Sequence, residues 1–352
     1  MTLLSRLVFF PKKKTSKSSG RIITNEISLV LPVKDNQQGV NHYLDTLFEI
    51  FLPREFPREV IIVDNNSNPP IWICNRHLNR GLVVTLLLCA KPGPAAARNF
   101  GVLHSTGSWI LFNDSDCLPT ETLFSGYILA DNGSVAYAGN IKVTGKDLLS
   151  KYYESQEILI PLKASSLENE FAPQYLITAN ALVWRETFLE VAGFNENIQI
   201  AGGEDVDLGL RLSQIGRLSY AFESIALHKF DDGYMGFYKR FIRYGLGNRM
   251  VEELWQIDMK PQRFRPNKRT PFNEVAAIFQ YLFLLVGYKR AAEIHSNNEF
   301  AKRECRSPKF EANKNYQTMA KKTVPNLPSK KPGKASGKGR GNAEPKSKPK
   351  EN

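Results

Sequence analysis

Two carboxylates stand one residue apart directly after an apolar stretch of the chain. They are Asp114 and Asp116 in the sequence NDSD, and the residues before them, 109–112 (WILF), predict a buried strand. Because ligands of open α/β sheets bind beyond the carboxyl ends of the strands, the pair lies where a site is expected. Carboxylates there can hold Mg²⁺ or Mn²⁺, hard cations that prefer oxygen ligands and substrate phosphates. A turn rich in Asp and Asn fits the same residues, so both interpretations stay open.

A second acidic cluster follows two glycines farther along the chain. Glu204, Asp205 and Asp207 fall in the first turn of a helix predicted over residues 204–215. Acidic side chains in a first turn interact favourably with the helix dipole, by about 0.3–1 kcal/mol each, which is the purely structural explanation. Three acids within four residues exceed what capping needs, so this cluster is a second candidate for chemistry.

The elements that must position these groups alternate between strands and helices in the first half of the chain. Apolar runs predict strands over residues 27–33, 59–63, 82–89 and 109–112, and the segments between them predict helices over 40–51 and 95–104. Later stretches predict helices over 151–166, 185–191 and 204–215, and strands over 175–184 and 219–228. Strands separated by helices of these lengths indicate βαβ crossovers, and therefore an α/β fold with a mostly parallel sheet and flanking helices.

Four motifs occur in order at these strand and helix ends. They are LPV (31–33) after the first strand, VDNNS (63–67) after the second, GPAAARN (93–99) before the NDSD strand, and GGEDVDL (202–208). In this order and spacing they resemble family 2 glycosyltransferases, which have the Rossmann-like GT-A fold. The resemblance covers residues 26–250, about two thirds of the chain. It implies an enzyme that transfers a sugar from a nucleotide-diphosphate donor to an acceptor hydroxyl.

The resemblance also implies roles for particular positions. Asp205 and Glu204 are the expected catalytic residues, with Asp205 as the base. Asp114 and Asp116 are expected to be metal ligands and to face the ribose and a metal-bound diphosphate. His228 would complete the metal site, so the expected cofactor is Mn²⁺ or Mg²⁺. Asn180 is a further candidate, because the strand predicted over residues 175–184 is expected to shape the acceptor and donor-sugar pockets. The complete set of expected substrate-binding residues is Pro32, Val33, Asp64, Asn65, Arg98, Asp114 and Asn180.

The mechanism that these parts imply is an inverting one. With one base and no carboxylate placed to form a covalent intermediate, a single displacement at the sugar C1 is the simplest account. We expect a UDP-sugar donor and a glycan, lipid-linked or protein acceptor, in polysaccharide or glycoconjugate synthesis. Two departures from the family are relevant. Asn65 stands where many members have a second Asp, and residues 240–244 (RFIRY) only partly match the Q-x-x-R-W signature of processive synthases.

The charge of the chain is concentrated at its two ends. The 352 residues carry a formal net charge of +12, but residues 1–21 hold six basic and no acidic side chains, and residues 321–352 hold ten basic and two acidic ones. The part between is close to neutral, which argues against a basic groove for nucleic acid on the folded domain. The tails suit either a solvated, solubilising role or peripheral contact with anionic lipid at the inner face of a membrane.

Cysteines and apolar runs favour a cytoplasmic protein. The four cysteines form no C-x-x-C pair, so neither a zinc site nor a disulfide framework is predicted. The apolar start of the chain precedes its basic cluster, which is the reverse of a secretory signal. Residues 276–288 (AAIFQYLFLLVGY) are too short to span a bilayer, and they predict a core or subdomain helix with an interfacial helix as the alternative.

We expect four segments: a basic N-terminal segment (1–25), a GT-A domain (26–250), a helical extension (251–306) and a disordered basic tail (307–352). Three other functions stay open. A nucleotidyltransferase also places acidic metal ligands after α/β strands, although residues 31–39 lack its usual glycine-rich basic loop. A nucleic-acid-binding protein would bind through the tails with a strong salt dependence. A non-catalytic nucleotide-sugar binder would hold the donor without turnover.

Overall fold

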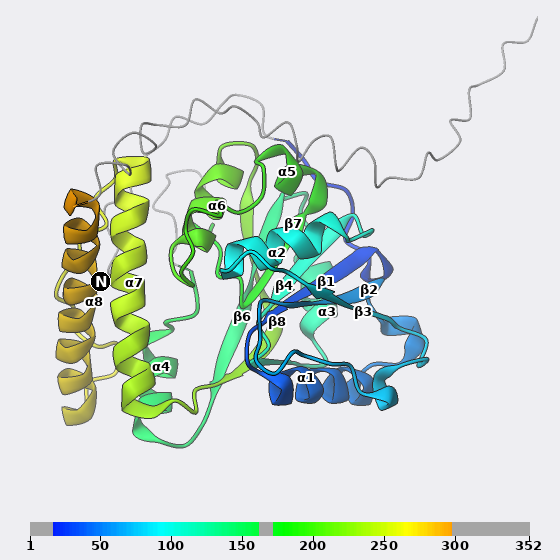
Figure 1. Ribbon diagram of the computed structural model, residues 1–352, viewed down its shortest axis with the longest axis horizontal. Helices are drawn as coiled ribbons and strands as arrows, with labels where there is room; N and C mark the ends of the chain where they lie inside the picture. The colour runs from blue at the N-terminus through cyan, green and yellow to red at the C-terminus, as the bar shows by residue number, and fades with distance from the viewer. Residues whose placement is uncertain (1–16, 162–171, 298–352) are drawn as a thin grey trace, which may run out of the picture.

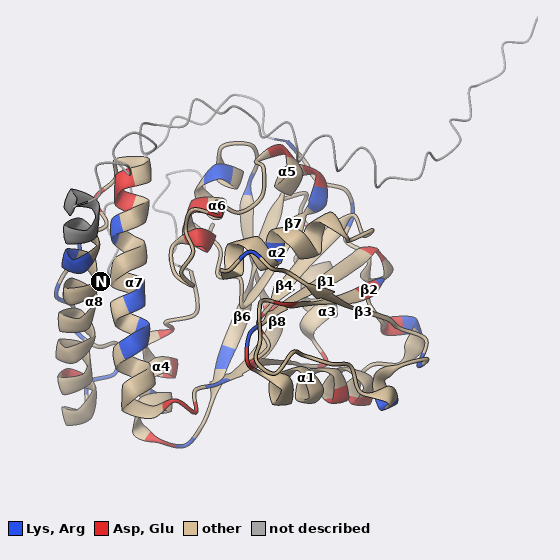
Figure 2. Cartoon of the chain, in the orientation of Figure 1, with Lys and Arg blue, Asp and Glu red and all other residues tan. Residues whose placement is uncertain are grey.

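The computed structural model describes residues 17–161 and 172–297 of the 352-residue chain. The helix predicted over residues 151–166 ends at Gln156, and residues 162–166 lie outside the described residues, as does the whole of the predicted basic tail. Residues 1–16, which hold most of the basic N-terminal segment, lie outside them too. In the described part, Lys and Arg positions are interspersed with Asp and Glu over the sheet and its helices (Figure 2), as expected for a nearly neutral domain.

Within the described residues, an eight-stranded sheet forms the centre of the molecule, in the order β3-β2-β1-β4-β7-β6-β8-β5. The α/β fold is confirmed, and β3, β2, β1 and β4 are parallel as predicted. The other half of the sheet is mixed: β7 runs antiparallel to β4 and β6, β5 runs antiparallel to β8, and β6 and β8 are parallel. The strands are β1 (Ile27–Val33), β2 (Glu59–Asp64), β3 (Val83–Leu88), β4 (Trp109–Asn113), β5 (Cys117–Pro119), β6 (Ala136–Thr144), β7 (Asn180–Trp184) and β8 (Leu218–Lys229).

The helices α1 and α2 pack against opposite faces of the parallel strands (Figure 1). The alternation of side chains along β1 explains this arrangement, because Leu29 and Leu31 join the apolar cluster of α1 while Val30 joins that of α2. Gly101 lets α2 approach the sheet closely, since a Cβ there would lie 2.6 Å from Val30 Cγ1. The helices are α1 (Gln37–Ile50), α2 (Pro94–Leu103), α3 (Leu123–Leu129), α4 (Leu148–Gln156), α5 (Arg185–Glu190), α6 (Glu204–Ser213), α7 (Gly233–Trp255) and α8 (Pro271–Asn297).

The second half of the domain follows the prediction only in part. The helices α5 and α6 and the strand β8 form where they were expected, whereas β7 occupies only the last five residues of the strand predicted over 175–184. The strand β6 and the helix α3 have no counterpart in the prediction. The apolar pattern of β6 is interrupted by Gly139 and Asn140, and a register irregularity falls between these two residues in its pairing with β8.

The helices α7 and α8 lie side by side at one flank of the molecule (Figure 1). They run in the same direction, because their contacts advance together along both helices. The ring centres of Tyr238 and Phe283 lie 5.0 Å apart, and farther along both helices Arg249 donates to the hydroxyl of Tyr288. The apolar residues 276–288 form part of α8. No helix in the described ranges is long and apolar enough to cross a membrane.

Candidate active site

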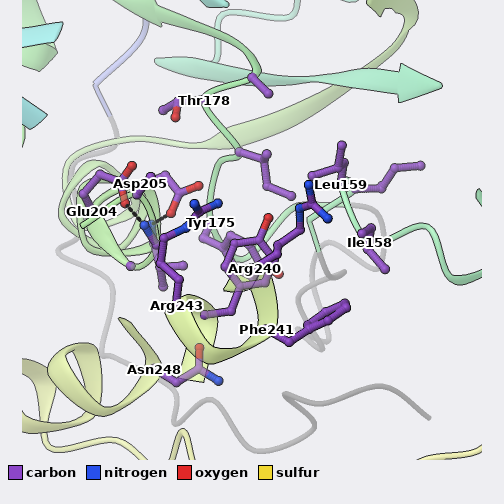
Figure 3. Close-up of a pocket in the computed structure, with 18 of the residues that line it drawn as sticks. Ile158, Leu159, Tyr175, Thr178, Glu204, Asp205, Arg240, Phe241, Arg243 and Asn248 are labelled. Carbon is purple, nitrogen blue, oxygen red and sulfur yellow. Dashed lines mark hydrogen bonds between the residues drawn. The ribbon is translucent and has the colours of Figure 1, made fainter. Parts of the chain in front are cut away.

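A pocket of about 290 Å³ opens where residues that follow β4 meet the end of β8, the start of α6 and one face of α7. Figure 3 shows Glu204 and Asp205 on one side of it, Ile158 and Leu159 on the other, and Arg240 between them. The pocket brings together most of the polar residues that the sequence singled out. Those that line it are Arg98, Asp114, Asp116, Glu204, Asp205 and His228.

Arg98 joins the two acidic motifs of the sequence. It lies in α2 with a side chain only 4% exposed, and its Nη2 donates to Asp114 Oδ1 at 2.8 Å. Its Nη1 donates to Glu204 Oε1 at 3.0 Å. Because Glu204 begins α6 and Asp114 follows β4, this buried guanidinium holds the start of α6 against the carboxyl edge of the parallel strands.

The adjacent carboxylates Glu204 and Asp205 have different surroundings. Glu204 is buried and both of its oxygens are engaged, one by Arg98 and the other by the backbone N–H of Gly202 at 2.6 Å. Asp205 is half-buried, and its Oδ1 accepts a hydrogen bond from the backbone N–H of Val206 at 2.9 Å. Burial and the negative charge of Glu204 raise the pKa of Asp205 to about 7, although Arg98 acts in the opposite direction.

Glycine at the start of α6 makes this placement feasible. Gly203 precedes the helix with φ of +99°, a backbone conformation that other residues rarely adopt. A Cβ at this position would also lie 3.0 Å from the carbonyl oxygen of Gly247 in α7. The two glycines before the acidic cluster thus allow the chain to turn sharply beside α7 and to present Asp205 to the pocket.

Asp116 and His228 form the part of the pocket that suits a metal ion. Among the described residues, the ligand atoms of Asp116, Cys117 and His228 lie within 4.8 Å of one another, and Asp116 Oδ2 is 3.4 Å from His228 Nε2. Asp116 directly precedes β5, which pairs with β8 so that Cys117 lies opposite His228. A carboxylate oxygen and an imidazole nitrogen at the wall of a pocket fit a cation such as Mn²⁺ whose other positions take phosphate oxygens. The buried sulfur of Cys117 is a soft ligand that such a cation disfavours.

Besides Asn180, four of the predicted substrate-binding residues do not line this pocket: Pro32, Val33, Asp64 and Asn65. Asp64 accepts hydrogen bonds from the backbone N–H groups of Ser67 and Ile71 at 2.9 and 3.0 Å, and it therefore holds the turn after β2. Asn65 accepts from the N–H of Gly93 at 2.8 Å, which ties this turn to the loop before α2. All four lie at or just beyond the carboxyl ends of β1 and β2, so their contact with a nucleotide stays a prediction.

Asn180 occupies a buried position in the sheet instead of the pocket wall. Its side-chain amide donates to the carbonyl oxygens of Asn140 and Ser224 at 3.0 and 2.9 Å, and its oxygen accepts from the hydroxyl of Tyr127 at 2.8 Å. These bonds link β7 to β6, β8 and α3. Because its polar atoms are engaged within the protein, we assign Asn180 to the structure of the sheet and leave it out of the proposed site.

The pocket also contains two arginines of α7 for which the sequence motifs predict no role. Arg240 donates to the hydroxyl of Tyr153 and to Asp232, and its guanidinium lies 4.2 Å from the centre of the Phe230 ring. Arg243 lines the pocket as well, and its buried Nε has no hydrogen-bond partner among the described residues. The R-x-x-R spacing places both side chains on one face of α7, which is the signal that could have identified them.

Comparison with known proteins agrees with the motifs. Residues 28–190 match the family model described as "Glycosyl transferase family 2". The chain is 26% identical to poly(ribitol-phosphate) beta-glucosyltransferase of Bacillus spizizenii over 162 residues, which cover 45% of this chain and 26% of that protein. It is 28% identical to pre-mycofactocin glycosyltransferase of Mycobacterium tuberculosis over 237 residues, which cover 64% of this chain and 46% of that protein. The chain thus spans less than half the length of these relatives.

A solved structure with a similar arrangement is that of a mannosyltransferase, PcManGT from Pyrobaculum calidifontis, in complex with GDP-Man and Mn²⁺. It aligns with a TM-score of 0.49 and 17% sequence identity, over 88% of this chain and 87% of that chain.

Proposed function

We propose that the chain is a family 2 glycosyltransferase that transfers a sugar from a nucleotide-diphosphate donor to an acceptor hydroxyl, with inversion at C1 and with the help of a divalent cation. One observation carries this proposal. A single pocket holds Asp205 together with Asp114 and Asp116, although about 90 residues separate the two motifs in the sequence, and Arg98 links them. A base and a diphosphate site must adjoin in such an enzyme, because the acceptor oxygen attacks the carbon that the diphosphate leaves.

Asp205 is the proposed general base. In a single displacement, the acceptor oxygen forms a bond to C1 while the bond from C1 to the diphosphate oxygen breaks, and the hydroxyl proton passes to a carboxylate. A pKa of about 7 gives Asp205 a substantial carboxylate fraction at neutral pH and a higher proton affinity than an ordinary Asp. Glu204 has both oxygens engaged, so its proposed role is to position α6 and to keep the proton affinity of Asp205 high.

The donor is proposed to bind with its diphosphate toward Asp116 and His228. These residues would hold Mn²⁺ or Mg²⁺, and the ion when bound supplies positive charge next to the leaving diphosphate. Asp114 is held by Arg98 at the edge of the pocket and is proposed to face the ribose. The nucleotide would then extend along the carboxyl ends of β1 and β2, toward Pro32, Val33, Asp64 and Asn65. A UDP-sugar is the expected donor, and a glycan, a lipid-linked molecule or a protein is the expected acceptor.

The experiment that tests the proposal measures release of nucleoside diphosphate from a panel of UDP-sugars and GDP-mannose with Mn²⁺, for the wild-type chain and for Asp205→Asn. The variant keeps the shape of the side chain but cannot accept the proton, so we expect turnover to fall by about 10²–10⁴-fold while donor affinity changes little. The matched control is Asp231→Asn, which alters an exposed carboxylate outside the pocket.

Two outcomes would contradict the proposal. Near-normal turnover by Asp205→Asn would show that this carboxylate is only part of the first turn of α6. Donor binding by the wild-type chain without turnover of any donor, with and without simple sugar acceptors, would favour the non-catalytic nucleotide-sugar binder.

A further inference from the structure

One face of α8 carries large apolar side chains that the described part of the chain leaves exposed. The five residues, which we call the α8 stripe, are Val275 (52% exposed), Ile278 (60%), Phe279 (48%), Leu282 (42%) and Val286 (39%). Residues three, four, seven and eleven positions apart fall on the same side of an α-helix, so the five form a continuous strip about three turns long. Figure 2 shows α8 without charged positions over most of this length.

The opposite face of α8 is fixed to the rest of the molecule. Leu284 is buried there, and Gln280 accepts a hydrogen bond from the hydroxyl of Tyr152 at 2.6 Å. Gly287 brings α8 close to α7, because a Cβ at this position would lie 2.0 Å from the carbonyl oxygen of Ile242. The stripe is therefore held turned away from the described part of the protein, and α8 cannot bury it there by rotating without breaking these contacts.

Basic residues stand at both ends of the α8 stripe. Lys268 and Arg269 precede α8, Lys289 and Arg290 follow Val286 within about one turn, and all four are exposed. From residue 268 to residue 290 the sequence contains one acidic residue, Glu274, which accepts from Arg269 at 2.6 Å. The rim of the apolar strip is thus positively charged.

We propose that the α8 stripe docks on the surface of a lipid bilayer with anionic headgroups. Apolar side chains along one side of a helix enter the boundary between headgroups and acyl chains, and flanking lysines and arginines bind the anionic headgroups. A second copy of the chain is a poorer occupant. Because both ends of the stripe are basic, a copy laid on it in either direction would bring like charges together. A bilayer meets both ends with opposite charge.

This orientation has a consequence for the pocket. Gln280 and Leu284, on the inner face of α8, belong to its lining, so the pocket lies about one helix diameter from the docked surface. The docking does not depend on the proposed transferase activity. If that activity is present, acceptors anchored in the same bilayer are the ones nearest to the pocket.

The test is co-sedimentation of the full chain with phosphatidylcholine vesicles and with vesicles that also contain phosphatidylglycerol, at low and at high salt. The first variant is Ile278→Asp/Phe279→Asp, and its matched control is Ile128→Asp/Leu129→Asp, a pair of exposed apolar residues on α3. The second variant is Lys289→Gln/Arg290→Gln, with Lys146→Gln/Lys151→Gln as its control for exposed basic residues elsewhere. The basic tails are present in every protein, so their contribution is the same throughout.

We expect the wild-type chain to partition to anionic vesicles. The apolar variant and the basic variant of α8 should each partition at least about tenfold less, while both controls stay near wild type. Thermal unfolding midpoints near that of the wild type would show that the variants are folded. Three results would overturn the proposal: equal partitioning of wild type and stripe variants, equal wild-type partitioning to neutral and anionic vesicles, or a dimer in light scattering that Ile278→Asp/Phe279→Asp dissociates. None of these measurements requires turnover, so they are independent of the test of the transferase.

Discussion

Two neighbouring carboxylates of α6 differ in their surroundings, because one of them is already engaged within the protein. Glu204 is buried and bonded to Arg98 and to the backbone of Gly202, whereas Asp205 reaches the pocket half-buried. Burial raises the pKa of both carboxyl groups, so the difference lies in their contacts: both oxygens of Glu204 are engaged within the protein, whereas Asp205 is placed to meet a substrate in the pocket. The contrast supports the proposal that Asp205 is the base, on physical grounds that are separate from the family motif.

The pH dependence of turnover tests this assignment. The pKa of Asp205 is raised to about 7, chiefly by burial and then by Glu204, so the free enzyme holds Asp205 protonated below that pH and ionised above it. A base works only when ionised, so kcat/KM should rise about tenfold per pH unit below pH 7 and level off above. The charged and titratable groups that face Asp205 are Glu204, Arg98 and Tyr244.

Glu204→Gln removes the like charge beside Asp205, so it should move the inflection of the pH profile to lower pH. The control is Glu223→Gln, an exposed residue on β8, which should leave the inflection in place. A profile flat from pH 5 to 8 would contradict the assignment.

The buried Arg98 should be important for stability as well as for the site. Removing one partner of a buried ion pair leaves the other charge unpaired, so Arg98→Met should lower the free energy of unfolding by about 3–5 kcal/mol in a denaturant titration. Arg76→Met is the matched control, because it breaks an exposed bidentate pair with Asp45, and such pairs contribute about 0–1 kcal/mol. A similar loss in the two variants would mean that Arg98 does not hold α6 in the way we describe.

At the level of the elements, the parallel half of the sheet was predictable and the mixed half only in part, since β8 was expected where it forms but β5 and β6 were not. β1, β2 and β4 are nearly continuous apolar runs, as expected of strands covered on both faces, and turn residues follow β1 and β2. β6 lacks such a run, and the antiparallel placement of β7 depends on contacts distant in sequence. The candidate site was likewise predictable only in part.

The sequence motifs predicted Arg98, Asp114, Asp116, Glu204 and Asp205, which all line the pocket. The pocket residues of α7 were not predicted, because their position depends on how that helix packs.

Asn180 illustrates what a local pattern cannot tell. A polar residue in a predicted strand is equally consistent with a ligand contact and with a buried hydrogen bond between strands. Only the register of β7 places the amide of Asn180 between β6 and β8. We expect Asn180→Leu to leave the Tyr127 hydroxyl and two carbonyls without this partner. Each such group costs about 1–3 kcal/mol, so the free energy of unfolding should fall by about 3 kcal/mol or more. Denaturant titration measures this.

The control for this variant is Asn140→Leu, which removes a more exposed amide from the neighbouring strand β6 and should have a smaller effect. Donor affinity, normalised to the folded fraction, should be unchanged by Asn180→Leu at low temperature. Unchanged stability with lost donor affinity would return Asn180 to the substrate site.

At the scale of the whole molecule, nucleotide and metal should act together on stability. The diphosphate carries two to three negative charges into a pocket that already holds Asp114, Asp116 and Asp205, so we expect it to bind well only with a cation at Asp116 and His228. A ligand at about a hundred times its Kd stabilises the native state by about 2.7 kcal/mol, which for a domain of this size raises Tm by about 5–10 °C. UDP with Mn²⁺ should produce such a shift in a thermal melt, and UDP or Mn²⁺ alone should not.

Asp116→Ala should abolish the part of the Tm shift that depends on Mn²⁺, because His228 alone cannot hold the ion against solvent. The control is Asp231→Ala, which removes an exposed carboxylate three residues after His228 and should keep the full shift. A full Mn²⁺-dependent shift in Asp116→Ala would remove this carboxylate from the metal site and leave Asp114 as the residue to test next.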